Sequence, residues 1–71
     1  MLSSCNYDKT KLLAKISKLM GFIDKHAVKD AEKDGHPLCG VEYKELKQDL
    51  ERHAEKLRAA IEGLSREGKY N

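Results

Sequence analysis

The chain has 71 residues and a net charge of +2, with 37% charged and only 6% aromatic side chains. A chain of this length forms at most one domain and buries a small core, so it is marginally stable unless it is stapled, metallated or oligomeric. The composition favours exposed helices over a sheet. The net charge is too small to indicate nucleic-acid binding without help from its distribution.

Cysteine usage and hydropathy bear on the compartment. Cys5 and Cys39 form neither a CxxC motif nor a dense disulfide framework, which favours reduced thiols and a cytoplasmic location. No segment approaches the ~20 apolar residues of a membrane span, so we expect no membrane partner. Leu2-Ser3-Ser4-Cys5 has the form of a bacterial lipoprotein cleavage box, which needs a charged and then a hydrophobic segment ahead of it. Only Met1 and Leu2 are available for that segment, so we do not expect lipidation unless the chain is a trimmed fragment.

A first helix is predicted from about Tyr7 to Asp34. Asn6 or Asp8 is expected to cap its start. Gly21 lies inside this helix, where it costs roughly 1 kcal/mol relative to alanine. The apolar residues recur at steps of three and four, which places them on one helix face within an arc of about 120°. They are Leu12, Leu13, Ile16, Leu19, Met20, Ile23 and Ala27.

Residues 35–40 contain the only proline and two of the five glycines, and they are predicted to form the turn. Gly35 suits the left-handed C′ position that ends a helix, and Pro37 suits the first turn of the next one. Pro37 is costly in the interior of a continuous helix. The expected fold class is therefore all-α, a two-helix antiparallel hairpin that forms a single domain over residues 1–71.

A second helix is predicted from about Pro37 to Arg66, with Gly68 ending it. Its apolar residues repeat every seven positions, which is typical of helices packed at a shallow angle. One series of this heptad seam is Tyr43, Leu50, Leu57 and Leu64. The companion series is Leu46, His53 and Ala60, which extends back to Cys39 and has Ile61 beside it.

A lone hairpin buries only one seam, so association is expected to complete the core. Two hairpins paired by a two-fold axis give a homodimeric four-helix bundle, and a different helical protein is the alternative partner. The expected protein interface is the apolar seam, which consists of Ile16, Leu19, Ile23, Tyr43, Leu46, Leu50, Leu57, Ile61 and Leu64.

The far side of the first helix carries a stripe of lysines around the only phenylalanine. On ideal helix geometry the lysines project within about 80°, and Phe22 lies about 125° from the centre of the apolar face. Lysines neutralise phosphates and an exposed ring stacks on unpaired bases, so the stripe is a candidate RNA-binding site. The alternative is a solvated face with Phe22 at the edge of the core. The stripe consists of Lys11, Lys15, Lys18, Phe22, Lys25, Lys29 and Lys33.

Two sets of residues have partial metal-site chemistry. The pairs His26–Asp30 and Asp49–His53 face the seam, and imidazole with carboxylate binds zinc or iron. The ligand set is sparse, so we interpret each pair as an i,i+4 helix contact and expect no cofactor. At the turn, His36 and Cys39 make half a zinc site.

Cys39 has a further candidate partner besides His36. In an antiparallel dimer, Cys5 of one subunit approaches Cys39 of the other. We interpret the two residues as unrelated thiols.

The stretch Leu50-Glu51-Arg52-His53-Ala54-Glu55-Lys56-Leu57 resembles the L-x-x-H-A-x-x-L form in the second helix of Rop-like plasmid copy-number proteins. That resemblance implies a hairpin that dimerises into a four-helix bundle and binds paired RNA loops through a basic face around one phenylalanine, here Phe22. The longer first helix and the proline-containing turn depart from that family. The short turn and the helix beginning near Tyr43 are also similar in shape to small two-helix chaperones of type III secretion systems.

No catalytic motif is present, because the sequence has neither a Gly-rich phosphate loop nor a nucleophile elbow. We therefore expect a non-enzymatic interaction module that associates through its apolar seam with itself or with another helical protein. Binding of structured RNA by the Lys/Phe face is the alternative function.

Overall fold

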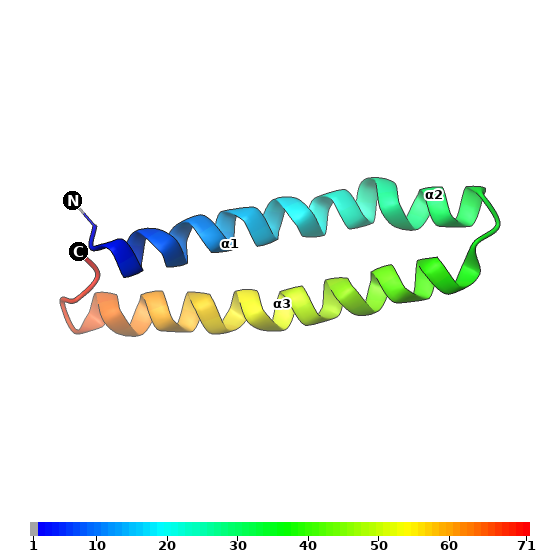
Figure 1. Ribbon diagram of the computed structural model, residues 1–71. Helices are drawn as coiled ribbons and strands as arrows, with labels where there is room; N and C mark the ends of the chain where they lie inside the picture. The colour runs from blue at the N-terminus through cyan, green and yellow to red at the C-terminus, as the bar shows by residue number, and fades with distance from the viewer. Residues whose placement is uncertain (1) are drawn as a thin grey trace.

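The computed structural model describes residues 2–71 as two antiparallel helical arms joined by a short turn (Figure 1). The first arm contains α1 (Ser4–Phe22), the π-helical segment η1 (Ile23–Ala27) and α2 (Val28–Lys33), and the second arm is α3 (Pro37–Arg66). The N- and C-termini lie at the same end of the hairpin. The all-α hairpin expected from the sequence is confirmed. Over residues 2–71, no helix is both long and apolar enough to cross a membrane.

The helix ends follow from local sequence chemistry. Gly35 has a φ of 72°, and the backbone N–H groups of Gly35 and His36 donate to the carbonyls of Glu32 and Ala31 at 3.2 and 2.8 Å. This pair of hydrogen bonds is the Schellman motif, which requires the left-handed conformation that glycine adopts without strain. Pro37 then occupies the first turn of α3, where its missing N–H costs nothing.

The second arm ends in the same way. Gly68 has a φ of 71°, and the N–H groups of Gly68 and Lys69 donate to the carbonyls of Ser65 and Leu64 at 3.1 and 2.7 Å. The predicted span of the second helix, Pro37 to Arg66, is confirmed. The glycine at each C′ position therefore fixes where each arm stops.

The start of the first arm differs from the prediction. The helix begins at Ser4, and its cap is Ser3, whose hydroxyl oxygen accepts a hydrogen bond from the Asn6 N–H at 3.2 Å. Asn6 and Asp8 are not caps, because both lie inside the helix. The prediction was wrong here because several residues with capping side chains follow one another, and any of them suits an N-cap.

The first arm also contains a π turn that the sequence does not indicate. The N–H of Val28 donates to the carbonyl of Ile23, the i→i+5 pattern of a π-helix. Ile23 is buried at this point. The residues beyond η1 are therefore rotated relative to their positions on an ideal helix.

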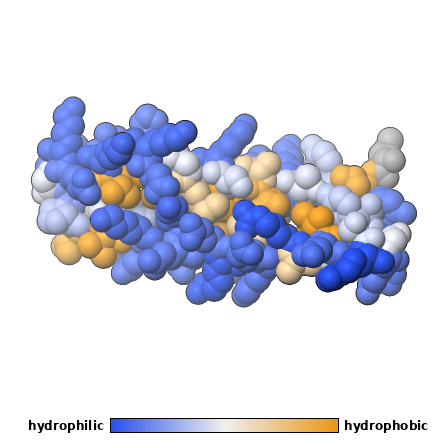
Figure 2. All heavy atoms as spheres, turned by 180° about the vertical axis from the view of Figure 1, so that it is seen from behind, coloured by the Kyte–Doolittle hydropathy of each residue, from blue (hydrophilic) through white to orange (hydrophobic). Residues whose placement is uncertain are grey.

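The hairpin is long and thin. Its Cα extents are 50 × 18 × 14 Å and its radius of gyration is 15.6 Å, whereas a compact domain of this length has about 11 Å. The buried apolar residues among those described are Ile23, Ala31 and Ala54, and no large side chain is fully buried. Figure 2 shows one face of the molecule, on which hydrophobic residues form a broken band between hydrophilic side chains. One chain alone therefore has a narrow core.

Candidate interaction surfaces

The burial pattern fixes the heptad frame of each arm. Positions a and d are residues 6, 9, 13, 16, 20 and 23 in the first arm and residues 40, 43, 47, 50, 54, 57, 61 and 64 in α3, and every one of them is buried or half-buried. These residues form the hairpin seam. It contains seven of the nine predicted interface residues, which are Ile16, Ile23, Tyr43, Leu50, Leu57, Ile61 and Leu64.

The companion series predicted for the second helix was wrong by one residue. Ala54 is buried and Gly40 lies in the seam, whereas Cys39, Leu46, His53 and Ala60 are all exposed. A Cβ atom on Gly40 would lie 3.9 Å from the Cβ of Ala31, so the two arms approach closely at the turn. The seam therefore uses Gly40, Lys47, Ala54 and Ile61, each of which follows a residue of the predicted series.

The residues displaced from the seam form a second surface, which we call the apolar edge. It consists of the g positions of both arms, which are Cys5, Leu12, Leu19, His26, Cys39, Leu46, His53 and Ala60, and all eight are exposed. Its three leucines are large hydrophobic residues with 44% to 52% of their surface exposed. In an antiparallel pair of helices the g positions lie on the same side of the seam. Phe22, from α1, and Cys39, from α3, line a common hollow on this side.

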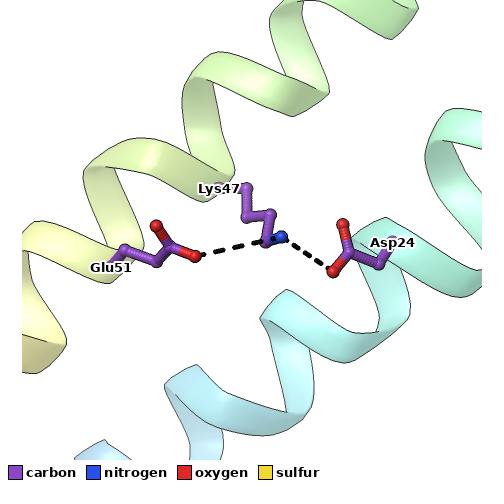
Figure 3. Close-up of polar contacts among 3 residues, drawn as sticks. All are labelled: Asp24, Lys47 and Glu51. Atoms are coloured by element: carbon purple, nitrogen blue, oxygen red, sulfur yellow. Dashed lines mark ion pairs between the residues drawn. The ribbon is translucent and has the colours of Figure 1, made fainter.

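The opposite side, which we call the polar edge, consists of the e positions of both arms. These are Thr10, Ser17, Asp24, Lys44, Glu51, Arg58 and Ser65, none of which is apolar. Lys47 reaches out from the seam to this edge, 2.8 Å from Asp24 and 3.9 Å from Glu51 (Figure 3). Because Asp24 belongs to the first arm and Glu51 to α3, this bridge shows that the two e rows share one edge.

The ion pairs of Lys47 also shift its own pKa. The hydrogen bond from Lys47 to Asp24, helped by the negative charges of Asp24 and Glu51, raises the pKa of Lys47 above its ordinary value and outweighs the lowering by burial. The raised pKa means that the charged form is favoured in the folded chain. Asp24 and Glu51 of the polar edge are thus paired with Lys47 within one hairpin.

The lysine stripe lies on the outer side of the first arm. All six of its lysines are exposed, and Phe22 is 55% exposed, which confirms that the ring lies off the core. The Phe22 ring packs on His26, with 5.4 Å between ring centroids. A shallow hollow beside the ring is lined by Lys18, Gly21 and Lys25.

The predicted 80° arc of the stripe needs correction, because it assumed one ideal helix. Lys11, Lys15 and Lys18 precede η1, whereas Lys29 and Lys33 follow it and are rotated by the π turn. The basic and aromatic character is therefore most coherent near Phe22.

The residues with metal-site chemistry are not brought together in one chain. Among residues 2–71, no group of three or more His, Cys, Asp or Glu side chains is placed to hold a metal ion. His26 instead stacks on Phe22, and Asp49 pairs with Arg52 at 3.3 Å. Cys5 and Cys39 are free, exposed thiols at opposite ends of the hairpin.

Asn6 has a structural role that sequence reasoning missed. It is 3% exposed, and its side-chain amide donates to the carbonyls of Lys69 and Asn71 at 2.9 and 3.1 Å. The hydroxyl groups of Thr10 and Tyr70 are also hydrogen bonded to each other. These contacts fasten the C-terminal tail to the start of α1. A polar residue at an a position of the seam is the signal that could have indicated such a partner.

Comparison with protein-family models, with curated proteins and with solved structures finds no match for this chain. The functional argument therefore depends on the surfaces described above.

Proposed function

We propose that this chain is a non-enzymatic interaction module whose apolar edge binds a second copy of the chain, giving a homodimeric four-helix bundle. The observation that carries the proposal is the contrast between the two edges. The g positions hold three exposed leucines, whereas the e positions hold no apolar residue. A hairpin that worked as a monomer would expose both edges to water and would have no use for this difference.

The accessible surface area of the chain supports a second copy as the partner. The accessible surface of the chain is 5428 Å², whereas a folded monomer of 8.1 kDa has about 4,500 Å². The excess of about 900 Å² is close to the roughly 800 Å² that each partner contributes to a standard interface. A second copy supplies an edge of the same length and chemistry, as an isologous two-fold interface requires.

Sedimentation equilibrium over a range of micromolar concentrations tests the proposal. We expect a reversible monomer–dimer equilibrium, with helicity that falls on dilution as the hairpin loses its partner. A stably folded monomer throughout this range would remove the proposal and would leave a different helical protein as the occupant of the edge. Cytoplasmic location belongs to the same proposal, because reducing compartments preserve free thiols such as Cys5 and Cys39.

Binding of structured RNA is the second candidate function, and the exposure of Phe22 among lysines favours it. Phe22→Ala is expected to weaken binding of an RNA stem-loop by roughly 1–3 kcal/mol, the range for a base–aromatic stack. The melting temperature should change little, because the ring is more than half exposed. Leu38→Ala, which removes another exposed side chain outside the stripe, is the matched control. A parent chain that binds no RNA at low salt would eliminate this function.

A further inference from the structure

We propose that the two copies pack antiparallel, with the two-fold axis perpendicular to the helices at the level of Leu19 and His53. This inference rests on the proposed function, which states only that the apolar edge binds a second copy. The axis places α1 of one copy against α1 of the other and α3 against α3. The turn of each hairpin then lies beside the termini of its neighbour.

The level of the axis follows from the register of the hairpin. Asp24 bonds to Lys47, and Ala31 lies beside Gly40, so seven residues forward along the first arm match seven residues back along α3. The apolar edge therefore has five levels, which are Cys5, then Leu12 with Ala60, then Leu19 with His53, then His26 with Leu46, and finally Cys39. The middle level is that of Leu19 and His53. An axis there covers both edges completely, whereas moving the axis by one heptad displaces the second copy by two heptads and exposes about 21 Å of edge at each end.

The direction of the axis follows from charges beside the edge. An axis parallel to the helices would also cover the edge, but it places α1 against α3 of the second copy. The c positions flank the edge, and this axis brings Lys15 level with Lys56 of the second copy. The dimer then contains two such lysine pairs, whose like charges repel. The perpendicular axis instead brings Lys56 level with Asp49 of the second copy, and Lys15 level with the Phe22 ring. Each lysine then gains an attractive neighbour.

Side-chain sizes agree with this arrangement. Leu19 meets its own copy at the axis, and one heptad away on α3 Leu46 meets Ala60 of the second copy. A large residue against a small one lets facing layers interdigitate. The arrangement thus covers all three exposed leucines of the edge.

Single cysteines placed in a Cys5→Ser, Cys39→Ser background test the axis directly. His53 should lie beside its own copy, whereas the two copies of Ala60 should be two heptads apart, about 21 Å. A disulfide needs Cα atoms within about 7 Å. Diamide, which accepts the two hydrogens lost as one S–S bond forms, should therefore link His53→Cys chains into covalent dimers and leave Ala60→Cys chains unlinked.

The two variants are matched, because both sites are exposed, lie on one helix row and differ by one heptad. Equal linking of both variants, or failure of both in a chain that sedimentation shows to be dimeric, overturns the antiparallel arrangement and leaves dimerisation intact. A monomeric parent chain overturns the proposed function and this inference together.

A charge swap gives a second, independent measurement. Lys56→Asp or Asp49→Lys should each raise the dimer dissociation constant about tenfold, since two attractive pairs become repulsive, and the double variant should recover most of the loss. Lys18→Asp makes the same charge change away from the edge and should have little effect. Tighter association of Lys56→Asp is the signature of the parallel axis, because it relieves the repulsion with Lys15, and it would overturn the inference.

Discussion

Leu46→Ala is the substitution that most directly separates an apolar edge that binds a partner from one that is merely solvated. Leu46 is 45% exposed in one chain. Complete burial of a leucine contributes about 1.5–3 kcal/mol, so covering the exposed part contributes roughly 0.7–1.4 kcal/mol per copy. A dimer contains the site twice, which gives about 1.4–2.8 kcal/mol. The dissociation constant is therefore expected to rise about 10- to 100-fold.

Sedimentation equilibrium measures this change, and Leu38→Ala provides the control. Leu38 belongs to the same helix and is 80% exposed, but it lies outside the apolar edge. Its replacement should leave the dissociation constant nearly unchanged. Equal dissociation constants for the parent and Leu46→Ala would refute the assignment of the edge. Equal weakening by the two leucine variants would show that association is non-specific.

Three further substitutions test the hairpin itself. Asn6→Ala should destabilise the fold by about 1–3 kcal/mol in denaturant titration, because the carbonyls of Lys69 and Asn71 lose a buried donor. Gly21→Ala should raise the melting temperature by about 4–8 °C, since the helix gains roughly 1 kcal/mol and nothing beyond the neighbouring residues and local helix backbone lies within 4 Å of the added methyl group. At pH values below 10.5, the ordinary Lys pKa, Asp24→Asn should lower the melting temperature. That difference should shrink as pH rises through the raised pKa of Lys47, because the neutral amine no longer attracts the carboxylate.

The fold could be predicted from the sequence because the positions of the turn and of the helix C-terminal ends depend on local chemistry. Gly35, Pro37 and Gly68 act through backbone conformation, which does not depend on what the helices pack against. The π turn over Ile23–Ala27 could not be predicted, since that segment contains no proline or glycine to mark it. The start of α1 was ambiguous because serine, asparagine and aspartate all cap helices.

The surfaces could be predicted only in part, because hydrophobicity does not define the heptad frame of α3. The true a positions are Gly40, Lys47, Ala54 and Ile61, a series with one large apolar residue. The neighbouring g series contains Leu46 and looked more like a core. The small residues of the a series allow the arms to approach closely, and Lys47 forms an ion pair with Asp24. The a series therefore lies in the seam, and the g series lies on the apolar edge. What seemed to be one wide seam is a seam and an adjoining edge.

The two proposed functions are compatible, and the antiparallel arrangement explains how. When α1 packs against α1 of the second copy, the two lysine stripes become neighbours, and Phe22 lies where they adjoin. Lys18 and Lys25 remain outside the edge and free to face phosphates. RNA binding would then require the dimer, so Leu46→Ala should weaken RNA binding even though Leu46 lies on the other arm. The loss should disappear at protein concentrations high enough to restore the dimer. An RNA affinity that ignores both Leu46 and protein concentration would show that the stripe binds as a monomer and that the two surfaces are independent.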